Sequence, residues 1–110
     1  MNNHIFRSYV DKITQQYGIT EQQMFSDGKS QKDVEPRHLF FYLCSLKEIS
    51  IVNIQTFLGE QGYSYHHVTI RKGMDKINRR VEEHPEYDVL VSKMQKITAK
   101  ALRNNVYRTQ

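Results

Sequence analysis

Apolar residues recur every three or four positions along most of the chain, which is the spacing of one face of an α-helix. The pattern predicts helices over residues 4–17, 20–25, 36–47, 50–59 and 67–81, and a further helix after residue 85. No pair of neighbouring segments shows the strand-turn-strand pattern of a β-hairpin. The sequence therefore predicts an all-α fold with six helices.

Residues that favour helix ends mark several of these boundaries. Gly18 stops the first helix, and Thr20 with Gln23 forms a capping box at the start of the second. The polar stretch from Ser26 to Glu35 is predicted to be a loop, after which Pro36 begins the third helix at a position where its missing N–H costs nothing. The third helix is apolar on several faces and is therefore predicted to be the central core helix.

The fourth and sixth helices are predicted to be amphipathic. Ser50 caps the fourth helix, which is predicted to end at Gly59. Its inward side chains are predicted to be Val52, Ile54, Phe57 and Leu58. Beyond His84-Pro85, the apolar residues of the sixth helix are Tyr87, Leu90, Val91, Met94, Ile97 and Leu102. The stripe of Tyr87, Leu90, Met94 and Ile97 is predicted to face the core rather than a second copy of the chain.

The fifth helix is predicted to have one apolar and one basic face. Ile70, Met74, Ile77 and Val81 follow the spacing i, i+4, i+7 and i+11, whereas Val68, Lys72, Lys76 and Arg79 turn outward. Just before it, Tyr63-Ser64-Tyr65-His66-His67 lies at the helix N-terminus, where free N–H groups and the helix dipole favour phosphate. This combination is typical of a DNA-recognition helix.

Charge is distributed unevenly along the chain. The 110 residues suffice for one domain with its own core. The net charge is +4, but residues 1–66 hold six Lys/Arg against seven Asp/Glu, whereas residues 67–110 hold ten against five. A basic excess of this kind favours a nucleic-acid partner, although it is also common among proteins without that function.

The remaining composition excludes several classes of protein. Cys44 is the only cysteine, so an internal disulfide and a cysteine-rich zinc finger are impossible, and its apolar neighbours predict a buried, unreactive thiol. The sequence shows no membrane span, no signal peptide and no Walker motif. We therefore expect a cytoplasmic, nucleoid-associated protein that binds neither a membrane nor a nucleotide.

The order and content of these segments resemble a known family. From about Asp11 to Ile97 the chain resembles the C-terminal DNA-binding domain of the bacterial replication initiator DnaA. The matching pieces are Tyr17-Gly18-Ile19, Pro36-Arg37-His38, Tyr42-Leu43, Ser50, Ile54, Gly59, His84-Pro85-Glu86 and, most specifically, His67-Val68-Thr69-Ile70 with Lys76-Ile77. The resemblance implies a six-helix, Trp-repressor-like domain with a helix-turn-helix over residues 1–99, followed by a basic tail or helix extension over residues 100–110.

The chain departs from the family pattern where the family reads bases. Tyr65-His66 stands in place of the family's Arg-Asp, so an acceptor-only carboxylate becomes an imidazole. Val68 replaces a threonine and keeps only its methyl contact, and extra residues lengthen the turn before it. Lys29 takes the place of an arginine that enters the minor groove, but lysine lacks the planar guanidinium. These departures imply a target sequence unlike that of the initiator.

The histidines and basic residues also allow other interpretations. Zinc binding by His66 and His67 is disfavoured, because adjacent helical residues point about 100° apart and no third ligand follows at a suitable spacing. A nuclease that pairs tyrosine with histidines is disfavoured as well, because its histidines alternate on a strand. For Lys72, Lys76, Arg79 and Arg80 the alternative is a solvated helix face, but the family pattern favours phosphate contact.

The sequence therefore predicts a non-enzymatic, stand-alone protein that binds double-stranded DNA without a cofactor. Base reading is assigned to Tyr65, His66, His67 and Val68, an approach to bases or phosphate to Thr69 and Lys72, backbone contacts to Arg37, Lys76 and Arg79, and the minor groove to Lys29. The expected role is replication or transcription control, with a homodimer or a replication protein as a further possible partner. The alternative is a protein-interaction module that kept the initiator-like fold without DNA binding.

Overall fold

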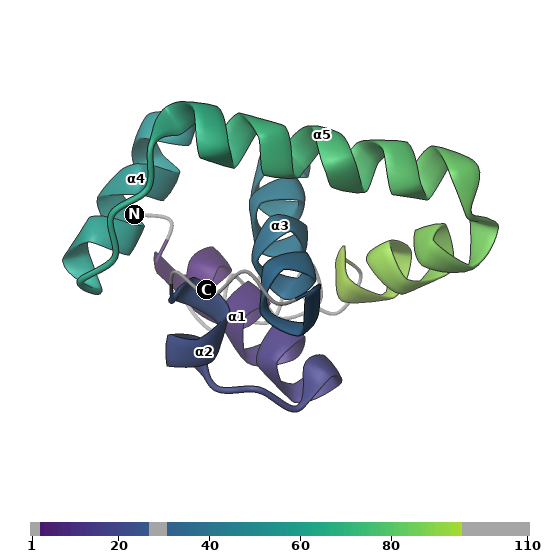
Figure 1. Ribbon diagram of the computed structural model, residues 1–110, viewed down its shortest axis with the longest axis horizontal. Helices are drawn as coiled ribbons and strands as arrows, with labels where there is room; N and C mark the ends of the chain where they lie inside the picture. Colours follow the sequence, from purple (N-terminus) through teal and green to yellow (C-terminus); the bar gives the residue numbers. More distant parts are fainter. Residues whose placement is uncertain (1–2, 27–30, 96–110) are drawn as a thin grey trace, which may run out of the picture.

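Two long helices that cross each other organise the fold. Helix α5 (His67–Glu83) runs along one edge of the molecule, and α3 (Gln31–Leu46) lies across it (Figure 1). The computed structural model describes residues 3–26 and 31–95, and around the crossing it places α1 (Asn3–Tyr17), α2 (Glu21–Phe25), α4 (Ile51–Glu60) and a helical segment at residues 85–95. The described residues form six helices and no strand, so the prediction of an all-α, six-helix fold is confirmed.

Helix α3 is the centre of the core, as predicted. Leu39, Phe40, Phe41 and Leu43 have no exposed surface, although they point to different sides of the helix. The ring of Phe40 lies at the middle of an aromatic cluster, with centroid distances of 5.1 Å to Phe25 of α2 and 6.1 Å each to Phe6 of α1, Phe57 of α4 and its neighbour Phe41. Burial of these rings joins four helices into one core.

The start of α3 differs from the prediction. The helix begins at Gln31, so Pro36 is an internal residue, and the segment from 31 to 35 is not a loop. Proline cannot donate a hydrogen bond to the carbonyl of the preceding turn, which costs one helical bond near the N-terminus. Tertiary contacts hold this first part in place, because Glu35 accepts hydrogen bonds from Tyr17 Oη at 3.0 Å and from Arg80 Nη1 at 2.6 Å.

Helix α4 follows the predicted pattern only in part. The Ser50 side chain accepts a hydrogen bond from the N–H of Asn53, which confirms the predicted cap, and Ile54, Phe57 and Leu58 are buried. Val52 is 66% exposed, so its predicted inward placement is wrong; the half-buried Ile51 packs against the core instead. The helix also continues past Gly59 to Glu60.

The turn between α4 and α5 has its own glycine. Gly62 has a φ of 92°, a backbone conformation that residues other than glycine rarely adopt. The N–H of Gly62 donates to the carbonyl of Gly59 at 3.0 Å, and the N–H of Tyr63 donates to that of Leu58 at 2.8 Å. These bonds close the end of α4 and turn the chain toward α5.

The inward face of α5 is the predicted one. Ile70 and Ile77 are buried, and Met74 and Val81 pack half-buried against the core. Gly73 lies where α5 crosses α3: a Cβ atom there would lie 2.7 Å from Cδ2 of His38 and 3.0 Å from Cδ2 of Phe41. The two helices therefore approach more closely than any side chain at this position would allow.

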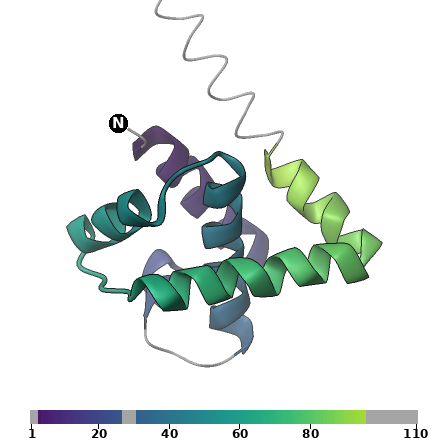
Figure 2. The same ribbon diagram turned by 90° about the horizontal axis from the view of Figure 1, so that it is seen from above.

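The segment at residues 85–95 folds back beside the C-terminal half of α5 (Figure 2). Tyr87, Val91 and Met94 are buried and Leu90 is half-buried, so the predicted core-facing stripe is confirmed for these residues. The guanidinium of Arg80 lies 5.5 Å from the centroid of the Tyr87 ring. Ile97, Leu102 and the predicted tail over residues 100–110 lie outside the described residues.

Cys44 is fully buried in α3, as predicted, and burial raises the pKa of its thiol.

Across residues 3–26 and 31–95, none of the helices combines the length and the apolar character needed to cross a membrane.

We expect Gly73→Ala to destabilise the protein. The new methyl group must displace the rings of His38 and Phe41, and overpacking of this kind costs about 1–3 kcal/mol. The better helix propensity of alanine offsets about 1 kcal/mol of that cost. Gly59→Ala is the matched control, because nothing lies within 4 Å of its Cβ position, and it should stabilise by up to about 1 kcal/mol. Urea unfolding of both variants measures the difference; equal effects would contradict the close crossing.

Candidate nucleic-acid interface

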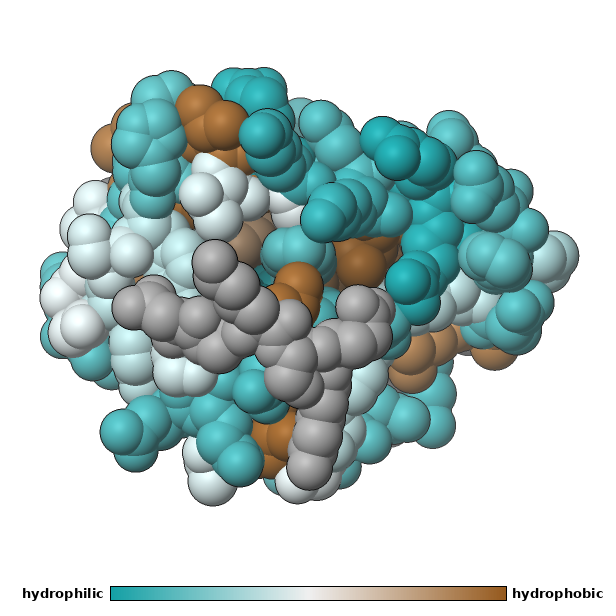
Figure 3. All heavy atoms as spheres, in the orientation of Figure 1, coloured by the Kyte–Doolittle hydropathy of each residue, from teal (hydrophilic) through white to brown (hydrophobic). Residues whose placement is uncertain are grey.

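The outward face of α5 carries most of the residues that the sequence assigned to DNA. His67, Val68, Thr69, Lys72, Lys76 and Arg79 are all exposed. Helix α5 runs along the upper edge of the molecule in Figure 1, and the surface there is mostly hydrophilic, with an apolar patch toward the left (Figure 3). The helix is 17 residues long, which corresponds to about 25 Å, so the face is long enough to lie in a major groove.

Basic side chains dominate the first three quarters of this face. Arg71, Lys72, Lys76 and Arg79 are exposed, and none of them takes part in an ion pair with the described residues. Asp75 is the one acidic residue between His67 and Arg79. Four cations on one helix face can therefore meet a polyanion without first breaking a salt bridge.

The far end of α5 has the opposite charge. Glu82 and Glu83 end the helix, and Glu86 and Asp88 follow at the start of the next segment; all four are exposed. Carboxylates repel phosphate groups, so the basic face has a limit near Arg79. A duplex on this surface would be confined to the N-terminal part of α5.

His66 and His67 form the N-terminal end of this face. His66 is the N-cap of α5, and its Nδ1 accepts a hydrogen bond from the N–H of Val68 at 3.2 Å. An accepting Nδ1 requires the tautomer with its proton on Nε2, so the edge that His66 presents to solvent is a donor. The two rings stack with centroids 4.3 Å apart. Both imidazoles are exposed at the first turn, where the N–H groups of Val68 and Thr69 donate to Nδ1 and to the carbonyl of His66.

Tyr65 does not share this exposed surface. Its hydroxyl donates to the carbonyl of Phe25 at 2.6 Å, and its ring packs edge-on against Phe41 with centroids 5.7 Å apart. The ring is half-buried. The predicted base contact of Tyr65 is therefore corrected. Its side chain points into the molecule, and its hydroxyl donates a hydrogen bond to the backbone carbonyl of Phe25.

Arg37 was predicted to contact the DNA backbone and is instead buried, with 7% of its surface exposed. Its Nε donates to the carbonyl of Met24 at 2.8 Å, and its Nη2 donates to that of Ser26 at 2.6 Å. The guanidinium therefore caps the end of α2, where free carbonyls and the helix dipole favour a cation. Lys29, predicted to enter the minor groove, lies outside the described residues.

A cavity that the sequence did not indicate lies between α3 and α5. Its volume is about 210 Å³, and it is lined by Val34, Glu35, His38, Lys76, Ile77 and Arg80. Burial lowers the pKa of His38 to about 4, with further contributions from Lys76 and Arg37. The sequence signal for its burial is its position three residues before the apolar Phe41, on the same side of the helix. At neutral pH the imidazole is uncharged and packs against Gly73.

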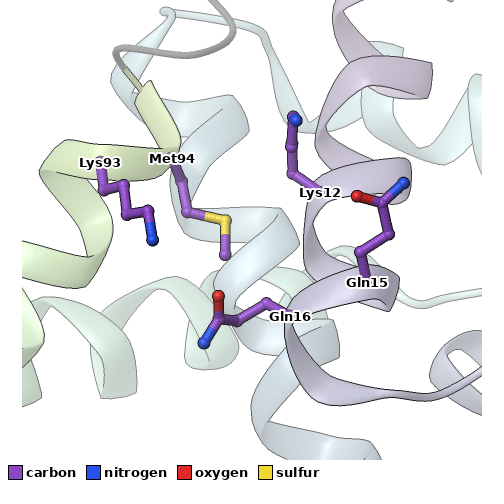
Figure 4. A pocket seen from close by; sticks show the side chains of 5 residues that line it. All are labelled: Lys12, Gln15, Gln16, Lys93 and Met94. Atoms are coloured by element: carbon purple, nitrogen blue, oxygen red, sulfur yellow. The ribbon is translucent and has the colours of Figure 1, made fainter.

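A second cavity, of about 250 Å³, lies between α1 and the segment at residues 85–95 (Figure 4). It is lined by Lys12, Gln15, Gln16, Lys93 and Met94. These described residues offer ammonium and amide groups and no carboxylate, imidazole or thiol, so they do not supply an acid-base pair. Within the described residues, no three His, Cys, Asp or Glu side chains are placed to hold a metal ion.

Comparison with protein-family models, curated proteins and solved structures finds no match for this chain. The resemblance to the initiator domain therefore remains a prediction from sequence motifs, and the functional argument depends on the surface of α5.

We expect Arg37→Met to lower the free energy of unfolding by about 2–4 kcal/mol, because the buried carbonyl of Met24 and the part-buried carbonyl of Ser26 each lose a charged donor. The variant should leave the salt dependence of DNA binding unchanged, because Arg37 does not reach the surface. Arg79→Ala is the converse control: stability within about 0.5 kcal/mol and a weaker salt dependence. Unfolding titrations and binding at several salt concentrations test both. A reduced salt dependence in Arg37→Met would restore its predicted phosphate contact.

His38 should make the protein sensitive to acid. Its folded pKa of about 4 lies below the unfolded value near 6.5, so the unfolded state binds a proton that the folded state does not. The free energy of unfolding should therefore fall as the pH drops from 6.5 to 4, and His38→Gln should remove at most about 3 kcal/mol of that fall. Urea unfolding across this range measures it. His67→Gln, at an exposed histidine, is the control. The same pH dependence of the free energy of unfolding in wild type and His38→Gln would contradict the lowered pKa of His38.

Proposed function

We propose that this chain is a non-enzymatic DNA-binding protein that places α5 in the major groove of a duplex. The observation that supports the proposal best is the outward face of α5, where Arg71, Lys72, Lys76 and Arg79 are exposed and form no ion pair with residues 3–26 and 31–95. Release of counterions from neutralised phosphates is the main source of affinity in such complexes. These cations follow the His66-capped N-terminus of α5 and are exposed, as His66 and His67 are.

The residues of α5 divide into two roles. His66, His67 and Val68 precede the cations and would meet base edges: imidazole N–H groups match guanine acceptors, and the valine methyls match the methyl group of thymine. Thr69 and Lys72 would approach bases or phosphate, and Lys76 and Arg79 would hold the backbone. The acidic end at Glu82 and Glu83 limits the footprint to the first three quarters of the helix.

The biological role that fits this proposal is control of replication or transcription by a chain that resembles part of an initiator. A protein of this kind would act at the nucleoid, alone, as a homodimer or with a replication protein.

A protein-interaction module is the second candidate. It is favoured by the acidic end of α5 and by Val89, which is 68% exposed beside Glu86 and Asp88. An apolar residue within acidic surroundings suits a basic partner surface better than it suits DNA. Salt-dependent duplex binding separates the two candidates.

We expect log Kobs for duplex DNA to fall linearly with log salt concentration. Four exposed cations on α5, and up to about six contacts in all, correspond to a slope of roughly −4 to −5 between about 50 and 200 mM salt. Fluorescence anisotropy with a labelled duplex measures it. Binding that is absent at 50 mM salt, or that ignores salt, would favour the interaction module.

Variants on α5 extend the same measurement. Lys72→Ala or Arg79→Ala should weaken binding to all sequences alike and reduce the slope by about 0.9 each, because a phosphate contact carries no base information. Lys47→Ala, beyond the end of α3, is the matched control and should change neither. His67→Ala should instead lower the ratio of specific to nonspecific affinity. An unchanged ratio would show that this part of the helix does not read bases.

A further inference from the structure

Tyr65 and Arg37 together cap the C-terminal end of α2. Three successive carbonyls, those of Met24, Phe25 and Ser26, accept hydrogen bonds from these two side chains. The Tyr65 hydroxyl is shared, with 2.6 Å to the carbonyl of Phe25 and 3.4 Å to that of Ser26. The last carbonyls of a helix have no partner within it, so side chains from α3 and from the turn before α5 supply the missing donors.

The same tyrosine is held from two further helices. The amide Nε2 of Gln55, on α4, donates to the backbone carbonyl of Tyr65 at 2.9 Å. The ring lies edge-on to Phe41 of α3, and the guanidinium of Arg37 lies 5.7 Å from the ring centroid. Tyr65 therefore fixes one point of the turn relative to α2, α3 and α4 at once.

The residues that follow have few such contacts. From His66 to Thr69 every residue is exposed, and the next buried side chain is Ile70. The first turn of α5 therefore packs against the rest of the protein only at its two ends, through Tyr65 before it and Ile70 after it. A shift at Tyr65 would move the imidazoles of His66 and His67. It would not move Lys72, Lys76 and Arg79, because these residues follow the buried Ile70.

We propose that Tyr65 is a positioning residue for base recognition: its hydroxyl bond to the end of α2 sets where His66 and His67 meet the bases. This inference rests on the proposed DNA-binding function. It assigns selectivity to a side chain that does not touch DNA, and it leaves phosphate binding to residues that Tyr65 does not control.

The test compares Tyr65→Phe with the wild-type chain. Phenylalanine keeps the ring on Phe41 and removes the hydroxyl bond. Affinity is measured for a duplex selected by the wild-type chain from a random library and for a shuffled duplex of the same composition. We expect the ratio of the two affinities to fall on the order of tenfold, since loss of one good base contact costs about that much. The salt dependence of binding to the shuffled duplex should not change, because no phosphate contact is lost.

Two controls separate positioning from general stability. Tyr63→Phe removes a hydroxyl from the same turn; the Tyr63 ring packs 5.3 Å from Phe25, but its hydroxyl makes no hydrogen bond with the described residues. Ile13→Val trims a fully buried side chain of α1, far along the chain from the turn, and weakens the fold without altering the junction. Both variants should keep the wild-type affinity ratio at a temperature where each is folded.

The outcomes are distinct. A wild-type chain that binds neither duplex overturns the proposed function and this inference with it. A wild-type chain that binds both duplexes equally keeps DNA binding but overturns base recognition by α5, and the positioning role of Tyr65 with it. A selective wild type whose affinity ratio is unchanged in Tyr65→Phe overturns the positioning role alone. The same result follows if Ile13→Val lowers the ratio as much as Tyr65→Phe does, because reduced stability would then explain both.

Discussion

The close crossing of α5 over α3 is the constraint on which the rest of the structure depends. Gly73 has no side chain, so the rings of His38 and Phe41 can lie 2.7 Å and 3.0 Å from the position that a Cβ atom would take. This contact brings Ile70 and Ile77 onto α3 and fixes the rotation of α5 about its own axis. The opposite face, with its lysines and arginines, is thereby directed to solvent.

Three of the five arginines that the structure describes connect parts of the fold. Arg7 donates to Glu21 at 2.7 Å and to Gln61 at 2.7 Å, Arg37 donates to the end of α2, and Arg80 joins Glu35 to the Tyr87 ring. The planar, forked guanidinium suits such bridges because it can serve two acceptors in fixed directions. Net charge therefore overstates the cations available to a partner. Within the described residues, the largest group of exposed cations without an ion pair lies on α5.

Most of the fold could be predicted from the sequence, because periodicity and capping are local signals. The all-α class, the inward face of α5, the capping box at Thr20 and the cap at Ser50 were all correct. The errors at Pro36 and Val52 have one origin: local rules do not include contacts between helices. Glu35 is held by Tyr17 and Arg80 from distant positions, and these bonds maintain a helical turn that the proline rule alone would not allow.

The residues of the candidate site also fall into two groups, those that helix periodicity could place and those that only contacts between helices place. The sequence by itself determined which residues of α5 face outward, since a residue's position around a helix follows from 3.6 residues per turn. Only the tertiary structure decided that Arg37 and Tyr65 point inward, because both bond to carbonyls of α2 that are remote in sequence. The free end of one helix needs donors, and the packing of the other helices determines which side chains lie close enough to supply them.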